Sequence, residues 1–445
     1  MSTTTVGNAP TQPEARPSLR HLRRGQVIGG ILLLALIAVV VLAAFGPFPW
    51  QLLGQATLLL SVVVVVLLAL GALLITLGIA AITRRRTRIL PWRGRLLRLV
   101  LVLGILLVGL TGTMFGSQWH ASTPPILGTD GKILPGSIAT LEQVTLGGSQ
   151  QWITIRGKSA HNPVLLYLGI GGPGAGGFPA SAMTLAPLEN HFVVVNWDQP
   201  GTGKSYNAVP IPTLTVERFV SDAHELTQLL RTRFHQEKIY VMGLSWGTIL
   251  GIKLVQQYPD LFSAYIGNGQ MVNTTENDRL GYQLALKIVT ERGDTATADT
   301  LRRNGPPPYV GDGMAMKYVA YNDVLFSYMD SPTIGQILLL APQFASEYGL
   351  LDKVNFDRGL IESFTVLYPQ LRDLDFTRSA TRLDVPMYFL VGRHDVNAMA
   401  SLVERYYNVL QAPHKELIWL ESGHGATPQE VRDAMVNHVL KQTRR

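Results

Sequence analysis

The stretch Gly243-Leu244-Ser245-Trp246-Gly247 joins an apolar run at 238–242 to an apolar-periodic run at 248–258. This pattern predicts a strand, a sharp turn and a helix. A serine in such a turn is held in a strained conformation with its hydroxyl exposed above the sheet edge, and glycines flank it because a Cβ would collide with neighbouring backbone. The stretch therefore predicts a G-x-S-x-G nucleophile elbow, although a glycine-rich turn that merely contains a serine would have the same letters.

Charge is distributed unevenly along the 445 residues. Residues 1–120 hold eleven arginines and one acid, Glu14, which gives +10, so the remaining residues carry −3 of the total charge of +7. Because the basic residues flank hydrophobic segments, they bear on membrane orientation, and we expect no nucleic-acid binding. The chain contains no cysteine, which excludes disulfides, thiolate catalysis and Cys-type zinc sites and leaves the redox compartment open.

Residues 25–117 predict a membrane domain. Residues 1–24 are polar and predict a disordered cytoplasmic tail, and no charged residue occurs from Gly25 to Thr83. A bilayer span needs about 20 apolar residues, and three runs meet this length, at about 27–45, 52–82 and 96–115. Arginine-rich segments before the first run and between the second and third place both segments in the cytoplasm, so we expect a multi-pass protein of the cell membrane whose C-terminal domain is extracytoplasmic.

The apolar runs have two other interpretations. Arg23-Arg24 followed by a run ending in Leu42-Ala43-Ala44 resembles a signal peptide, but a second apolar run follows at once. The third run could lie on the membrane, but its polar face is too poor for an interfacial helix. The segment 118–136, rich in proline and glycine, then predicts a linker.

From residue 137 onward the pattern alternates between short apolar runs and helical periods. A hairpin is predicted around Gly147-Gly148, and the clearest helix runs from Val216 to Phe234 with Thr215 as its N-cap. Strands alternating with helices predict a mostly parallel, doubly wound α/β sheet with right-handed crossovers. The alternation covers 137–271 and 384–445, while helical periods interrupted by prolines fill 272–383, which predicts a helical cap inserted into the sheet-forming pattern.

The elbow serine needs a base, and the base needs a carboxylate to hold its tautomer. In an elbow fold these residues follow the serine in the order acid, then histidine. Asp395 follows the predicted strand 387–391, and His424 follows the last apolar run, so both should lie at the carboxyl edge of the sheet. We therefore predict that Ser245, Asp395 and His424 form a catalytic triad, and that His394 is a surface residue; a loop aspartate and a solvated histidine are the alternatives.

An oxyanion hole requires two backbone donors. The N–H of Trp246, directly after the nucleophile, is the first, and the glycine-rich loop Gly169-Ile170-Gly171-Gly172-Pro173-Gly174 should supply the second. A different glycine-rich segment, 198–205, ends in Gly-Lys-Ser and imitates a phosphate-binding loop. That pattern requires glycine where this chain has Asp198, so we expect no nucleotide site.

Residues from about 140 to 445 resemble the α/β-hydrolase superfamily and, within it, the proline iminopeptidase family of serine peptidases. The family's oxyanion loop, its Asp-Gln-Arg-Gly-x-Gly-x-Ser segment and its Gly-x-Ser-Trp-Gly elbow correspond in order to 170–174, 198–205 and 243–247. Two positions depart from it, because Ile170 replaces the family's histidine and Pro200 its arginine. The hydrogen bonding of these loops must therefore differ from the family's.

The resemblance implies that Ser245 is the nucleophile, that Asp395 and His424 are its partners, and that Gly172 and Trp246 donate to the oxyanion. It also implies cleavage of an N-terminal residue, often proline, from peptides, with carboxylates of the cap holding the free amino group. Glu276, at the entrance of the cap, is our candidate for that carboxylate, and Gly171 is a further substrate-binding candidate; an exposed acid at a helix start is the alternative for Glu276.

Three functions remain after these observations. The leading one is a membrane-anchored serine aminopeptidase that contacts the lipid bilayer through its spans and needs no cofactor and no metal. An esterase or lipase with the same triad would differ in its substrate, an ester in place of a peptide. A non-catalytic receptor or scaffold with the same fold is the third. Ser245 in the elbow argues against epoxide hydrolases and haloalkane dehalogenases, which use aspartate there. The oligomeric state stays open.

Overall fold

The computed structural model describes residues 90–169, 172–180, 184–331 and 341–443. The chain divides into two compact units, 1–117 and 118–445. Helix α3, Leu90–His120, contains the third apolar run, which is therefore helical. The predicted tail and the first two spans lie outside the described residues. Among the helices of the described ranges, none is both long enough and apolar enough to cross a membrane.

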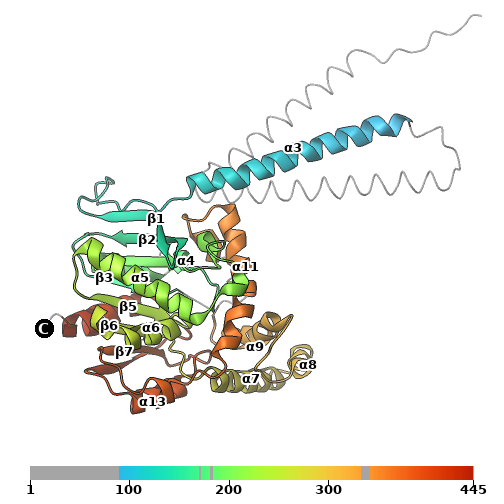
Figure 1. Ribbon diagram of the computed structural model, residues 1–445. Coiled ribbons are helices and arrows are strands. Elements are labelled where there is room, and N and C mark those ends of the chain that lie inside the picture. The colour runs from blue at the N-terminus through green and yellow to red at the C-terminus, as the bar shows by residue number, and fades with distance from the viewer. Residues whose placement is uncertain (1–89, 170–171, 181–183, 332–340, 444–445) are drawn as a thin grey trace, which may run out of the picture. The chain divides into compact units, whose positions relative to one another are not determined.

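An eight-stranded sheet organises the second unit, with strands in the order β1-β2-β4-β3-β5-β6-β7-β8 (Figure 1). β2 pairs antiparallel with both β1 and β4, and all other neighbours pair in parallel. This confirms the predicted mostly parallel sheet. The strands are β1 Ile138–Leu146, β2 Ser149–Gly157, β3 Val164–Tyr167, β4 Val193–Asp198, β5 Ile239–Leu244, β6 Phe262–Asn268, β7 Met387–Gly392 and β8 Lys415–Leu420.

Helices cover both faces of this sheet. Side chains alternate across each central strand, so in β5 Val241 packs into the cluster on one face while Met242 packs into the cluster on the other. The first face is covered by α5, Val216–Phe234, α6, Trp246–Gln257, and α13, Ala400–Val409. The opposite face is covered by α14, Pro428–Ala434, with the π-type turn that continues it to Leu440. Buried strands covered on both sides are what a doubly wound fold requires.

Helices between β6 and β7 form the inserted cap. They are α7 Thr274–Glu291, α8 Thr295–Asn304, α9 Met314–Tyr328, α11 Leu350–Leu367 and α12 Phe376–Ser379. The cap has its own apolar cluster, made by α7, α8 and α9 around Ala285, Leu301 and Leu325. Two short α-helices of the described ranges remain, α4, Phe178–Ala180, and α15, Lys441–Thr443.

Two local predictions are confirmed in detail. The Thr215 side chain accepts a hydrogen bond from the Arg218 N–H and caps α5 at the predicted residue. Gly147 and Gly148 both have positive φ, 53° and 72°, between the paired strands β1 and β2. Such a two-residue turn matches the twist of a hairpin and favours glycine.

Phe219 of α5 provides a test of how the sheet is held to its helices. Its ring is fully buried and lies 6.3 Å from Trp197 of β4 and 5.9 Å from Trp246 at the elbow. Replacing it with alanine should leave a cavity and lower the free energy of unfolding by about 3–5 kcal/mol, as measured by denaturant unfolding. Ser221→Ala, at an exposed position of the same helix, should stay within about 0.5 kcal/mol of wild type; equal losses in both variants would contradict the packing assigned to Phe219.

Candidate active site

Ser245 occupies a strained turn between β5 and α6. Its backbone has φ 53° and ψ −115°, one of three positive φ values at non-glycine residues in the described ranges. Such a conformation costs about 1–3 kcal/mol and persists only where surrounding contacts impose it. Ser245 N–H donates to the Asn268 carbonyl at 3.1 Å, and Thr248 N–H donates to the Ser245 carbonyl at 2.9 Å, so the turn is fixed on both sides of the serine.

The two glycines of the elbow are required by backbone packing. A Cβ on Gly243 would lie 2.3 Å from the Gly247 carbonyl oxygen, and a Cβ on Gly247 would lie 2.4 Å from the Leu168 carbonyl oxygen at the end of β3. Neither contact can be relieved by rotating a side chain, because the opposing atoms belong to the main chain. The glycine spacing of the motif thus follows from a close approach of α6 to the sheet.

Asp395 and His424 lie together at the carboxyl edge of the sheet. His424 Nδ1 is 3.0 Å from Asp395 Oδ2 and 3.2 Å from Oδ1, and both side chains are buried, at 7% and 2% exposure. The Asp395 carboxylate also accepts the N–H groups of Asn397 and Ala398 at 2.9 and 2.8 Å. A carboxylate held in this way fixes the orientation of the imidazole and its tautomer.

The end of β6 brings the serine and the histidine to one place. Asn268 binds the Ser245 N–H, and a Cβ on the next residue, Gly269, would lie 2.9 Å from Cε1 of His424. On the other side, a Cβ on Gly425 would lie 3.5 Å from Leu244, the residue before the serine. Ser245 and His424 therefore both lie against the end of β6, at Asn268 and Gly269.

The glycine-rich loop after β3 lies between the elbow and the cap. It starts against the elbow, where Leu168 meets Gly247, and Gly172 packs against the Phe364 ring of α11, since a Cβ there would lie 3.1 Å from the ring. Gly174, at φ 90°, meets the Gly359 carbonyl of α11 so closely that no side chain fits. Gly171 and Ile170 lie outside the described residues. Trp246 is the first residue of α6, so its N–H is among those that the helix leaves free at its N-terminus.

The segment after β4 links these parts, a role that the sequence did not reveal. Gln199 accepts the Trp246 indole N–H at 3.0 Å and donates to the Leu168 carbonyl at 3.1 Å. Asp198 accepts from the Gly177 N–H at 3.0 Å, the Lys204 N–H at 2.9 Å and the Tyr348 hydroxyl at 2.8 Å. Complete burial raises the pKa of Asp198 to about 7. The glycines of segment 198–205 are the sequence feature that indicates this network, because side chains at their positions would collide with its tightly packed polar groups.

Two cap acids differ sharply in environment. Glu276 forms a forked ion pair with Arg279, at 2.9 and 3.1 Å, and its side chain is 30% exposed. That pairing lowers the pKa of Glu276. Asp278 is only two residues further along α7, in the same turn but on a different side of the helix. It is buried and accepts hydrogen bonds from the Tyr368 and Tyr321 hydroxyls at 2.8 and 3.2 Å. Burial raises the pKa of Asp278 to about 7.

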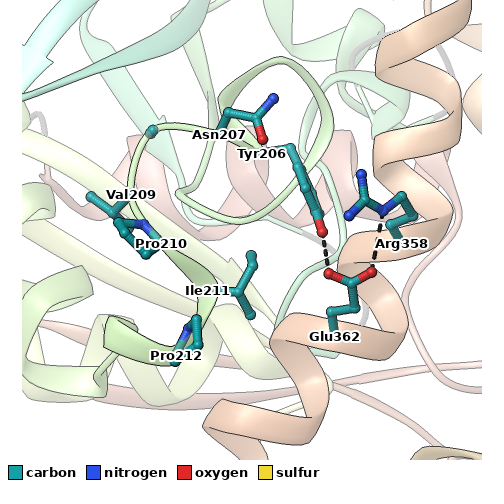
Figure 2. Close-up of a pocket in the computed structure, with 9 residues that line it drawn as sticks. Tyr206, Asn207, Val209, Pro210, Ile211, Pro212, Arg358 and Glu362 are labelled. Atoms are coloured by element: carbon teal, nitrogen blue, oxygen red, sulfur yellow. Dashed lines mark hydrogen bonds and ion pairs between the residues drawn. The ribbon is translucent and has the colours of Figure 1, made fainter.

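A pocket of about 520 Å³ lies away from these residues, between 206–212 and α11. Figure 2 shows that the Glu362 carboxylate accepts hydrogen bonds from the Tyr206 hydroxyl and the Arg358 guanidinium, while Pro210 and Pro212 lie on the opposite wall. The charges of this pocket are thus paired with one another, and none of its lining residues belongs to the predicted triad or oxyanion hole.

Within the described ranges no group of three or more histidine or acidic side chains could hold a metal ion.

Comparisons with known proteins agree with this geometry. The model of the serine aminopeptidase S33 family matches residues 181–309, which include the elbow. A probable aminopeptidase, YbaC of Bacillus subtilis, is 30% identical over 311 residues, which cover 69% of this chain and 96% of that protein. A putative carbamate hydrolase, RutD of Enterobacter cloacae, is 22% identical over 271 residues, 60% of this chain and 86% of that protein.

Solved structures are more distant. The proline iminopeptidase of Mycobacterium smegmatis superposes with a TM-score of 0.48 at 17% identity and covers 68% of this chain and 98% of its own. A proline iminopeptidase-related protein of Thermus thermophilus gives a TM-score of 0.46 at 21% identity over the same share of this chain and 98% of its own. The present chain has the sheet and the elbow of this fold, and it is similar to YbaC along nearly the whole of that relative. Together these observations show that the chain belongs to the α/β-hydrolase superfamily, in the serine aminopeptidase S33 family.

Proposed function

We propose that this hydrolase is a membrane-anchored serine aminopeptidase that removes N-terminal residues from peptides through an acyl-enzyme on Ser245. The observation that carries the proposal is the buried Asp395–His424 pair beside the strained elbow, with 3.0 Å between Oδ2 and Nδ1. A serine hydroxyl is a weak nucleophile until a positioned base removes its proton. In this proposal His424 is the base and Asp395 is the carboxylate that orients it.

The proposed reaction has two halves. Ser245 Oγ attacks the scissile carbonyl while His424 takes its proton, and the oxyanion forms in front of the N–H groups of Trp246 and Gly172. When the C–N bond breaks, His424 returns the proton to the leaving amine and the acyl group stays on Ser245. Water then attacks the ester with His424 again as base, which releases the acid and restores the serine. Each oxyanion donor in comparable enzymes contributes about 3 kcal/mol.

Recognition of a free amino group would require a carboxylate in the cap. Asp278 is the stronger candidate for this role, because Glu276 is already neutralised by Arg279 whereas the hydrogen-bond partners of Asp278 are neutral tyrosines. Contacts connect Asp278 to the oxyanion loop, since the Tyr368 ring stacks on Phe364 at 4.5 Å and Phe364 lies against Gly172. The ammonium group of a substrate would then be the cationic partner of the Asp278 carboxylate.

An esterase with the same triad is the second candidate. It is favoured by the saturation of Asp278 with tyrosine hydroxyls and by the small cavity beside it, of about 10 Å³. A cavity of this volume holds about one water molecule, so the tyrosines would have to move before an amino group could enter. Ester hydrolysis needs no such movement.

The nucleophile is tested by Ser245→Ala. This change should abolish turnover and labelling by a fluorophosphonate probe, because the probe reacts only with an activated serine. Ser221→Ala, on the surface of α5, is the matched control and should be labelled like wild type. Labelling that persists in Ser245→Ala, measured by gel fluorescence or intact mass, would refute the assignment.

The substrate is tested with purified wild type and two cap variants on prolyl and other aminoacyl amides beside short and long acyl esters. Asp278→Asn should raise KM for the free-amino substrates by roughly tenfold or more, the scale of one charged hydrogen bond of about 1.5–3 kcal/mol, and leave the esters unchanged. Glu276→Gln should change neither. Turnover of esters alone by wild type would refute the aminopeptidase and favour the esterase.

Membrane attachment is part of the proposal, and its support is the sequence alone, through the three apolar runs and the arginines that flank them. With the N-terminus in the cytoplasm, protease added to intact cells should remove the C-terminal domain, as followed by a C-terminal tag. A cytoplasmic marker protein should survive the same treatment and be digested only after permeabilisation. Protection of the tag in intact cells would contradict the orientation.

A further inference from the structure

The loop that carries Asp395 is held by the cap. Asn277 of α7 spans this loop with one side-chain amide, since its Nδ2 donates to the Asn397 carbonyl at 2.7 Å and its Oδ1 accepts the Met399 N–H at 2.9 Å. The Asn277 side chain is buried, with the residue 7% exposed. Both polar ends of the amide are therefore satisfied by main-chain groups of the Asp395 loop, an arrangement that permits one position of the loop.

Helix α9 holds the same loop from a second direction. Asn397 Nδ2 donates to Asn322 Oδ1 at 2.8 Å, and the Val396 N–H points to the Met329 sulfur at 3.4 Å. Met329 also packs against Gly423, the residue before His424, because a Cβ on Gly423 would lie 3.1 Å from the Cβ of Met329. The cap thus contacts three of the four residues that follow Asp395, namely Val396, Asn397 and Met399.

The same loop also orients the Asp395 carboxylate. The N–H groups of Asn397 and Ala398 donate to Asp395 Oδ1 at 2.9 and 2.8 Å, while Oδ2 faces His424. Asn397 is therefore held by the cap through its carbonyl and side chain and holds the carboxylate through its N–H. A displacement of this loop by the cap would change the angle at which the carboxylate meets the imidazole.

We propose that Asn277, assisted by Asn322, is a positioning residue that couples the cap to the geometry of the Asp395–His424 pair. The inference rests on the proposed triad and adds that the triad is complete only while the cap is seated on the loop 396–399. Asn277 acts through Asp395 and touches no reacting atom.

The test is the rate of fluorophosphonate labelling of the full-length protein as a function of pH. Asn277→Ala should lower the maximal labelling rate roughly 10- to 100-fold, the scale of a small misplacement of catalytic groups. The midpoint of the pH profile should also move to lower pH, because a displaced carboxylate stabilises the protonated imidazole less. A loss of stability alone would reduce the amount of active protein and leave the midpoint where it is.

Two further variants sharpen the result. Asn322→Ala should shift the midpoint in the same direction by a smaller amount, and it keeps the inference testable if Asn277→Ala does not fold. Gln283→Ala, an exposed residue of the same helix α7, should match wild type. In an Asp395→Ala background, Asn277→Ala should have no further effect, because the residue through which it acts is gone.

The outcomes separate this inference from the proposed function. Wild-type rates and an unchanged midpoint in both asparagine variants would overturn the coupling and leave the triad intact. An equal fold-loss from Asn277→Ala with and without Asp395 would overturn it as well, since the two residues would then act independently. Absence of labelling in wild type, or labelling in Ser245→Ala, would instead refute the triad itself.

Discussion

The close approach of α6 to the end of β3 is the constraint on which the site depends. Gly247 lies against the Leu168 carbonyl and Gly243 lies against Gly247, in both cases at distances that exclude a Cβ. This packing forces Ser245 into φ 53° and places it at the carboxyl edge of the sheet. Strain of this kind is maintained by the surrounding structure, and here the Asn268 carbonyl and the buried core under α6 maintain it.

The polar network around Asp198 and Gln199 extends this constraint to the cap. Gln199 joins the Trp246 indole to the end of β3, and Asp198 joins Gly177, which follows the glycine-rich loop, to Tyr348. Lys204, next to this network, forms a buried ion pair with Asp352 of α11 at 2.9 Å. Buried pairs and carboxylates are stable only when every partner is present, so the glycine-rich loop and α11 are fixed together. The proposed oxyanion loop is thereby held by the cap on one side and by the elbow on the other.

The cap consequently has two connections to the chemistry. One runs through α11 to the glycine-rich loop, by way of Gly359 and Phe364. The other runs through α7 and α9 to the Asp395 loop, by way of Asn277 and Asn322. The helices inserted between β6 and β7 therefore contact both the proposed oxyanion loop and the loop of the proposed triad acid, Asp395.

The sequence by itself determined the elements whose causes are local. Thr215 caps α5, the glycines 147 and 148 turn the first hairpin, and the strand ends before Asp395 and His424 place both side chains at one edge of a parallel sheet. Only the tertiary structure distinguished Glu276 from Asp278, which belong to the same turn of α7 and differ in whether Arg279 or buried tyrosines surround them. It alone showed the roles of Asp198 and Asn277, whose partners lie 150 and 120 residues away. Contacts of that separation leave no periodic trace in the chain, because they depend on which surfaces meet once the sheet and the cap have packed.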